Sequence, residues 1–474
     1  MTLPVILLIA ALSLLLRAPF LARLRPWLLL TLSALAVFYL QPLTPIRYLD
    51  FWLPVLTLLL TLLAWLLQTP PEDRTPRLSR ENYTAAALLA LTALTAAATR
   101  FIAFDPILTA SRPPQFALVL AVILAAAALA GLTARFAPLR PRWLGAAIFT
   151  LLALFLILKT PALALLAARG LRALAGQSPD LAAAADLRWL GFSYIAFRLI
   201  HTLRDRQTSP RAARTDLRSY VIYVLFPPAL AAGPIDRLDR FTRDLAQPPA
   251  PLAEDLLPAG QRLTLGLLKK FVLADSLAVI ALTPQAAAQT HSPLWMALMV
   301  YAYAFQIYLD FSGYTDIAIG LGRLSGIRLP ENFNQPYRKP NLTQFWNNWH
   351  MTLTQWIRAY VFNPLTRALR TTARPLPVWA ILLIGQTLTM LLIGLWHGLT
   401  LNFLIWGLWH ALGLFVQNRW SAWAAVRLKN VLAHPAVRPL GPLLTFHYVA
   451  LGWVWFALPH PAQTWHVFRT LFGW

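Results

Sequence analysis

Long apolar runs recur along the whole chain and are separated by short polar segments. The clearest are residues 3–16, 51–67, 83–98, 116–132, 143–158, 376–395 and 399–416. A helix crosses the hydrocarbon core of a bilayer with about 20 mostly apolar residues, and somewhat fewer suffice when the flanking residues reach the interface. The pattern therefore predicts an all-α polytopic membrane protein with roughly eleven to thirteen transmembrane helices.

The pattern changes near residue 188. Residues 1–187 are rich in Leu and Ala and carry few polar groups inside the apolar runs, which predicts an N-terminal scaffold of transmembrane helices. From 188 to 474, polar and aromatic residues enter the apolar runs and Pro and Gly interrupt them, as at Pro227-Pro228, Gly313 and Pro336. Broken helices are tolerated at membrane depth only where protein or a water-filled cavity satisfies the freed backbone groups. The second region is therefore predicted to contain re-entrant or interfacial helices around a cavity.

Two polar, aromatic stretches stand out there, residues 330–365 and 394–413. Each holds a Trp-His pair, ending in His350 and His397. An ionisable side chain at membrane depth is costly and usually marks a functional site, so both His residues are candidates. Helical spacing predicts that Trp346 and His350 share one helix face.

Glycines and acids near these stretches add to the picture. Gly394 and Gly398 flank His397 and predict room for a substrate beside the ring. Asp310 and Asp316 lie inside an apolar segment, where an unpaired carboxylate costs on the order of 3 kcal/mol. We expect Arg, backbone N–H groups or His residues as partners, since a carboxylate often orients an imidazole.

Two other His residues carry less weight. His201 and Asp205 have a His-xxx-Asp spacing that some soluble acyltransferases use, but such a pair at a basic helix end is easily structural. His410 is expected to be a buried His with its hydrogen bonds satisfied.

Composition narrows the class of protein. Charged residues make up 12% of the chain against about 25% in soluble proteins, and the net charge is +23. The charges are scattered over short loops rather than gathered on one face. This distribution excludes nucleic acid as a binding partner and favours contact between the basic loops and membrane lipid. Alternation of Arg-rich and Arg-poor loops places the N-terminus outside and the loop 204–218 in the cytoplasm. Because Arg17 and Arg23 follow the first apolar run instead of preceding it, we expect a retained span.

The chain has no cysteine, which excludes a thiolate nucleophile, a disulfide framework and a Cys metal site. It also has no HExxH, no GxSxG and no Walker A motif. Neither a metal nor a cofactor is predicted.

Several motifs occur together and in order. They are Gly233-Pro-Ile-Asp-Arg237, Gly266-Leu-Leu-Lys-Lys270, Asp310-Phe-Ser-Gly-Tyr-Thr-Asp316, Pro330-Glu-Asn-Phe-Asn-Gln-Pro-Tyr337, Phe345–Leu353, Gly394-Leu-Trp-His-Gly398 and Leu451-Gly-Trp-Val-Trp-Phe456. With these residues the sequence resembles the membrane-bound O-acyltransferase (MBOAT) superfamily, and within it the bacterial branch of alginate O-acetyltransferase and D-alanyl-teichoic acid transferase. The resemblance covers about residue 188 to the C-terminus, and would make that region the catalytic core.

The resemblance implies transfer of an acyl group to a hydroxyl through a central tunnel across the membrane. The donor would be an acyl thioester or an acyl carrier protein. The family's invariant His falls on His397, and its partner, Asn or His in relatives, falls on His350. An imidazole that titrates near neutral pH suits a general base, because an alcohol is a poor nucleophile. The candidate substrate-binding residues are Trp346, Asn347, Trp349, Trp396, Asp310, Asp316 and Asn334.

Three functions remain open at this point. The first is transfer of acetyl to an extracytoplasmic polysaccharide or cell-wall polymer in the cytoplasmic (inner) membrane, with a periplasmic or extracellular accessory acyltransferase as a partner. The second is D-alanylation of a teichoic-acid-like polymer. The third is a polymer transporter or flippase, which predicts inverted hydropathy repeats that this sequence does not show.

Overall fold

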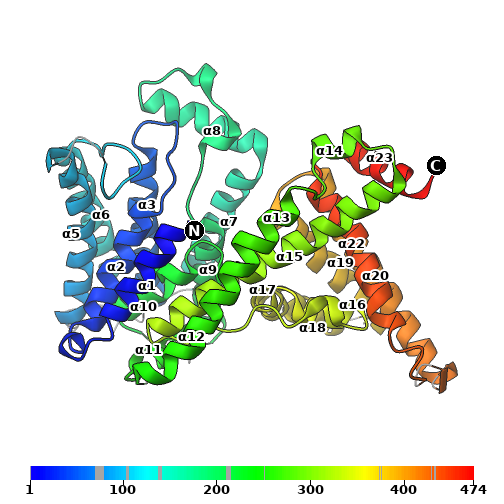
Figure 1. The fold of residues 1–474 in the computed structure, drawn as a ribbon. Helices are drawn as coiled ribbons and strands as arrows, with labels where there is room; N and C mark the ends of the chain where they lie inside the picture. The colour runs from blue at the N-terminus through cyan, green and yellow to red at the C-terminus, as the bar shows by residue number, and fades with distance from the viewer. Residues whose placement is uncertain are drawn as a thin grey trace. The chain divides into compact units, whose positions relative to one another are not determined.

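The computed structural model describes residues 2–69, 80–102, 106–136, 141–209, 215–249, 251–372, 374, 376–428, 430–431 and 434–473. Every element of regular structure in these ranges is a helix, as Figure 1 shows. The predicted all-α fold is therefore confirmed.

Helices long and apolar enough to cross a membrane number seven within the described ranges. They are α3 (Leu49–Gln68), α5 (Arg80–Ile102), α6 (Phe116–Phe136), α7 (Pro141–Lys159), α15 (Pro293–Leu324), α19 (Val378–His397) and α22 (Leu440–Ala457). Two shorter apolar helices are α1 (Leu3–Leu15) and α2 (Arg25–Tyr39). The number is below the eleven to thirteen predicted, because other apolar runs form short helices or, as in α20 (Leu401–Arg427), include polar side chains. A multi-pass membrane protein remains the class that these helices define.

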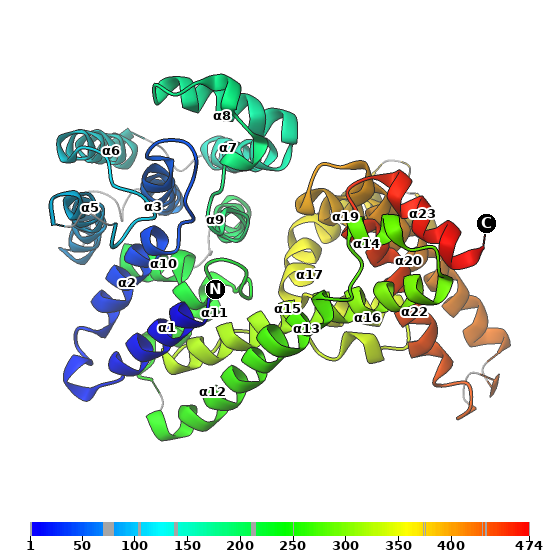
Figure 2. The ribbon, with the colours of Figure 1, turned by 45° about the horizontal axis from the view of Figure 1, so that its top comes forward.

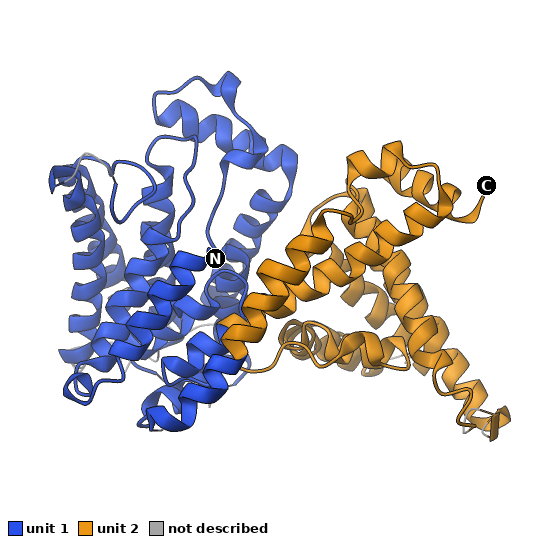
Figure 3. Cartoon of the chain, viewed as in Figure 1, with its two compact units in different colours: residues 1–261, 318–329 blue, residues 262–317, 330–474 orange. Residues whose placement is uncertain are grey.

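The chain forms two compact units, which Figure 3 shows in different colours. Unit 1 comprises residues 1–261 and 318–329, and unit 2 comprises residues 262–317 and 330–474. The remaining helices of unit 1 are α8 (Pro161–Leu174), α9 (Phe192–Thr208), α10 (Leu217–Leu225) and α11 (Leu238–Ala246). The predicted division by function, into 1–187 and 188–474, stays a prediction.

In unit 1, α10 lies at the centre of a helix cluster. It packs against α2, α3, α5 and α9, and α3, α5 and α6 lie side by side in both ribbon views (Figures 1 and 2). Most side chains of α10 are fully buried. The last carbonyl groups of a helix have no partners within the helix, so those of α10 need partners from other segments. The buried guanidinium of Arg198 on α9 supplies one, since it donates to the carbonyl oxygens of Val224 at 2.7 Å and Ala229 at 2.6 Å.

Two helices of unit 1 correct the predicted cytoplasmic loop. The loop was predicted over 204–218, but α9 continues to Thr208. Arg204 and Arg206 therefore lie on a helix, and Arg206 is buried. The sidedness of the loop itself stays a prediction.

Unit 2 is built around three long helices. Helices α19 and α20 form an antiparallel hairpin, and α22 packs on α20. The other helices of this unit are α12 (Leu252–Leu267) from residue 262, α13 (Asp275–Ala278), α14 (Pro284–Gln289), α15 up to residue 317, α16 (Leu342–Asn348), α17 (Met351–Ile357), α18 (Asn363–Arg370) and α23 (Pro461–Phe472). Two wider π-helical turns, Leu268–Ala274 and Arg358–Phe362, interrupt the regular helices.

Glycine sets the distance between α19 and α20. A Cβ atom on Gly407 of α20 would lie 2.7 Å from the carbonyl oxygen of Met390 on α19. Because that contact is with backbone, no side-chain movement can relieve it. The hairpin therefore requires glycine here.

We expect Gly407→Ala to destabilise the protein by about 1–3 kcal/mol, the usual cost of overpacking. The measurement is the melting temperature of the purified protein in detergent. The matched control is Gly170→Ala on α8, where a Cβ meets nothing within 4 Å. That change should raise stability by about 0.5–1 kcal/mol, because alanine favours a helix interior. Equal melting temperatures for the two variants would contradict the close contact.

Candidate functional site

His350 lies at a break between two helices of unit 2. Helix α16 ends at Asn348 and α17 begins at Met351, and His350 between them has φ +45° and ψ +54°. His is one of the residue types that tolerate this left-handed conformation. The prediction that Trp346 and His350 share one continuous helix face was therefore wrong.

The side chain of His350 is buried and hydrogen-bonded to Asn332. The imidazole Nδ1 lies 3.0 Å from the Asn332 amide oxygen. The same oxygen accepts from the backbone N–H of Thr352 at 3.2 Å and from its hydroxyl at 2.9 Å. Burial lowers the pKa of His350 to about 3, so the ring is neutral at physiological pH.

His397 is the last residue of α19, and its ring lies among other aromatic rings. Its centroid is 4.6 Å from that of Phe456 and 5.7 Å from that of Phe403, which it stacks on.

Trp396 connects the two His residues. Its ring centroid is 4.4 Å from that of His397 and 6.1 Å from that of His350. Two imidazoles that are distant in sequence thus lie near the same indole. This arrangement is the centre of the candidate site.

The glycines beside His397 do not leave the room that the sequence suggested. A Cβ on Gly394 would lie 2.3 Å from the carbonyl oxygen of Phe403, and one on Gly398 would lie 3.0 Å from its ring. Phe403 fills the space that was predicted for a substrate. These glycines allow α20 to approach α19.

Two predicted substrate-binding tryptophans lie inside an aromatic core. Trp349 is 5% exposed, and its ring lies within 6.0 Å of the rings of Tyr308, Phe333, Tyr337, Phe345 and Trp453. Trp346 is 6% exposed and packs edge-on against Trp406 and His410. Packing in this core accounts for the burial of Trp346 and Trp349. Their contact with a substrate stays a prediction.

The two predicted asparagines are exposed. The amide oxygen of Asn347 accepts from Arg358 at 2.5 Å, and the backbone N–H of Asn334 donates to the Asn348 carbonyl at 3.1 Å. Their binding roles stay predictions as well.

The two acids of α15 pair with cations from the neighbouring helix. Asp316 lies 2.5 Å from Arg262 and 2.6 Å from Lys269, and Asp310 pairs with Lys270. Arg was among the expected partners, whereas a role in orienting an imidazole is not seen in these contacts. The pairs flank a close crossing, because a Cβ on Gly266 would lie 2.7 Å from the Gly313 carbonyl oxygen. The motif residues here join two helices.

His410 is buried, as expected, but not satisfied. It is 0% exposed, and neither ring nitrogen has a hydrogen-bond partner within the described part of the chain. Gly452 packs directly against it, since a Cβ there would lie 2.8 Å from Nε2. The expectation of satisfied hydrogen bonds was therefore wrong.

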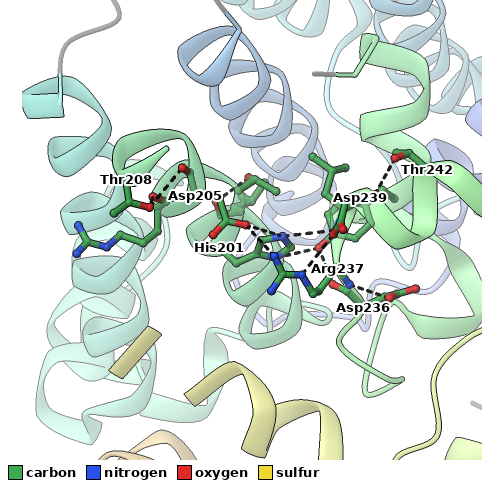
Figure 4. A network of polar contacts seen from close by, with 12 residues as sticks. His201, Asp205, Thr208, Asp236, Arg237, Asp239 and Thr242 are labelled. Atoms are coloured by element: carbon green, nitrogen blue, oxygen red, sulfur yellow. Dashed lines mark hydrogen bonds and ion pairs between the residues drawn. The ribbon is translucent and has the colours of Figure 1, made fainter. Parts of the chain in front are cut away.

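His201 of unit 1 lies in a separate polar network, shown in Figure 4. The Tyr223 hydroxyl donates to the Asp236 carbonyl at 2.8 Å, so it accepts from His201 Nδ1 at 3.1 Å. Nε2 then accepts from the Leu238 backbone N–H at 3.5 Å. Burial lowers the pKa of His201 to about 3. Nε2 thus links α9 to the first residue of α11, and Nδ1 links α9 through Tyr223 to the Asp236 carbonyl of the motif Gly233–Arg237. These contacts favour a structural role.

Among the cavities that the described residues line, two have a volume of about 660 Å³ each, one in each unit. The cavity in unit 2 is lined by Phe305, Tyr308, Gln335, Tyr337, Arg338, Pro439, Pro442, Leu443 and Phe446. Neither is lined by His350 or His397. The central tunnel stays a prediction. No group of three or more His, Cys, Asp or Glu residues in the described ranges could hold a metal ion.

Sequence reasoning missed Asn332 as a partner of His350. The residue lies inside a motif that was noted, but no spacing rule connects positions 18 apart across a loop and a helix break. The only signal was an amide beside aromatic residues in an apolar region.

The fold and the paired His residues define a multi-pass membrane protein with an imidazole site. The chain belongs to the MBOAT, membrane-bound O-acyltransferase family, whose model matches residues 144–441. That match includes both His350 and His397.

Curated relatives support this membership. The chain is 29% identical over 273 residues to a teichoic acid D-alanyltransferase of Bacillus subtilis, covering 57% of this chain and 69% of the relative. It is 32% identical over 295 residues to the probable alginate O-acetylase AlgI of Pseudomonas aeruginosa, covering 60% and 51%. It is 33% identical over 261 residues to a peptidoglycan O-acetyltransferase of Helicobacter pylori, covering 54% and 46%. The matches thus span about half to two thirds of these relatives' own lengths.

For the His201 network, we expect His201→Ala to lower the melting temperature. The change leaves the Leu238 N–H without its acceptor, and a buried unsatisfied group costs about 1–3 kcal/mol. The matched variant is Asp205→Asn, which alters a partly exposed carboxylate 4.0 Å from the ring. It should cost less than about 1 kcal/mol and leave acyl transfer unchanged. Loss of transfer in Asp205→Asn at unchanged stability would show that this pair takes part in the reaction.

Proposed function

We propose that this protein transfers an acyl group from a thioester-type donor to hydroxyl groups of an extracytoplasmic polysaccharide or cell-wall polymer. Acetyl is the proposed acyl group, and the cytoplasmic (inner) membrane is the proposed location. The observation that supports this most directly is that the rings of His350 and His397 both lie near the ring of Trp396, within the family match. Two of the relatives described above are named for O-acetylation.

The proposed reaction uses His397 as general base. Its imidazole takes the proton of the acceptor hydroxyl while the hydroxyl oxygen attacks the thioester carbonyl carbon. The new C–O ester bond forms, the C–S bond breaks, and the proton passes to the departing thiolate. His350 is the partner that orients a reactant by a hydrogen bond. No metal or cofactor is needed for this sequence of steps.

D-alanylation of a teichoic-acid-like polymer is the second candidate. It is favoured by the relative from Bacillus subtilis and by Gly233-Pro-Ile-Asp-Arg237, which is closer to that branch. The proposed partners are an acyl thioester or acyl carrier protein and the acceptor polymer, together with an accessory acyltransferase outside the membrane.

The donor can be tested through the thiol that the reaction releases. The chain has no cysteine, so a thiol reagent detects this product without background from the protein. Purified protein in lipid vesicles would be given acetyl-coenzyme A or a D-alanyl carrier protein, each with a hydroxyl-bearing polymer. Polymer-dependent thiol release from acetyl-coenzyme A supports acetylation. Release from the D-alanyl carrier protein alone would favour D-alanylation instead. Release from neither would contradict the proposed function.

We expect His397→Ala to lower the transfer rate by about 10²–10⁴, the usual contribution of a general base. Folding should persist, because the ring lies at a helix end and is only partly buried. His397→Asn should be as inactive, since an amide cannot take up a proton at neutral pH. Rates are compared at equal amounts of folded protein, measured by size-exclusion chromatography. A wild-type rate in His397→Ala would contradict the assignment.

At His350, the changes to Asn and to Ala should have different effects on the transfer rate. His350→Asn should retain measurable activity, because asparagine tolerates the left-handed backbone and its amide can both donate and accept. His350→Ala should lose most activity. Rates for the four variants in matched membranes decide the point. If His350→Asn is as inactive as His397→Asn, the two His residues act as one coupled unit.

A further inference from the structure

The Asn332 amide is hydrogen-bonded to His350, and the orientation of this amide is fixed. It is 0% exposed, and its oxygen accepts from the Thr352 backbone N–H at 3.2 Å. A backbone N–H can only donate, so the atom facing Thr352 and His350 must be the oxygen. The amide nitrogen has no partner within the described residues.

The orientation of Asn332 determines the state of the His350 ring. Because the amide oxygen can only accept, the Nδ1 of His350 that faces it at 3.0 Å must carry the hydrogen. A neutral imidazole has one N–H, so Nε2 carries the lone pair. His350 can then accept a hydrogen bond or a proton through Nε2, but it cannot donate one to a developing oxyanion.

The backbone holds this loop in place without help from the Asn332 amide. The Asn332 carbonyl accepts from the Met351 N–H at 2.9 Å, and the Asn334 N–H donates to the Asn348 carbonyl at 3.1 Å. These two bonds lie on either side of the helix break at His350. Loss of the amide alone should therefore leave the loop attached.

We propose that Asn332 is a positioning residue that holds His350 with Nδ1 protonated and Nε2 presented as an acceptor toward a second hydroxyl of the acceptor polymer, beside the one that is acylated and whose proton passes to His397. The proposal rests on the proposed function and deepens it. It assigns His350 to the hydroxyl-bearing polymer and not to the carbonyl oxygen of the thioester. Residues that orient metal-binding imidazoles typically contribute about 10- to 100-fold to activity, and we expect a loss of the same order here.

The described elements around His350 carry several ionisable groups. They include Asp310, Asp316, Tyr308, Tyr314 and Arg323 on α15, Glu331 in the loop, Arg358 after α17 and His397 on α19. Asp310, Asp316 and Glu331 are ion-paired with Lys270, Lys269 and Arg262, and Arg358 donates to Asn347. A carboxylate introduced at position 332 would therefore be the one in hydrogen-bond contact with Nδ1.

Three variants test the proposal. Asn332→Leu removes the acceptor at similar volume, Asn332→Asp keeps an acceptor oxygen, and Thr352→Val removes another donor to the same oxygen without touching His350. Thiol release is measured per folded molecule with the better of the two donors, as a function of pH. A wild-type rate measured alongside shows whether the proposed function holds at all.

We expect Asn332→Leu to be 10- to 100-fold slower per folded molecule. Asn332→Asp should recover most of the rate, and Thr352→Val should stay within about threefold of wild type. In Asn332→Asp the carboxylate stabilises the protonated ring and so raises the pKa of His350. As the pH is lowered, activity should therefore be lost at a higher pH than in wild type.

Other outcomes overturn the proposal. An unchanged rate per folded molecule in Asn332→Leu would make Asn332 structural. Equal losses in Asn332→Leu and Asn332→Asp would assign the effect to the amide nitrogen. If Asn332→Leu does not fold, Asn332→Asp decides alone, and an unchanged pH profile there contradicts the proposal. In each case an active wild type leaves the proposed function standing.

Discussion

The site depends on one oxygen atom, the amide oxygen of Asn332, which accepts three hydrogen bonds. Two come from Thr352 at the start of α17 and one from His350 at the helix break. Without an acceptor, a left-handed residue between two short helices would leave buried donors unpaired, at about 1–3 kcal/mol each. The orientation and the tautomer of the imidazole thus depend on this oxygen, whereas two backbone hydrogen bonds on either side of the helix break hold the loop itself.

Aromatic packing sets the surroundings of this oxygen. The rings of Phe311 and Trp396 lie against His350, and those of Phe403 and Phe456 lie against His397. Around the buried His350, apolar walls keep the imidazole neutral, because the charged form loses its hydration. A neutral ring is the form that a base needs before it accepts a proton. The apolar character of the region therefore serves the proposed chemistry as well as the membrane fold.

The sequence predicted what depends on periodicity and on motifs. The long helices followed from apolar runs, and His350 and His397 followed from the cost of burying an imidazole. The helix break at His350 could not be predicted, because nothing in Trp349-His350-Met351 departs from helical propensity in the way Pro or Gly does. Gly394 and Gly398 were misread because a glycine next to a functional residue looks the same whether it faces a substrate or a backbone. Asn332 needed a contact between distant positions, which spacing does not give.

The paired acids illustrate how a motif can be specific without being part of the chemistry. Asp316 and Asp310 hold their cations on either side of the Gly266–Gly313 crossing, where two helices meet at backbone distance. A carboxylate in this position would be costly if unpaired, so the cations and the acids require each other. Glycine provides the proximity that makes the ion pairs possible, and the ion pairs fix the register at which the glycines meet. Helix α15 also carries Phe311, whose ring packs against His350. The Gly266–Gly313 crossing and its ion pairs therefore help to position Phe311 beside the imidazole.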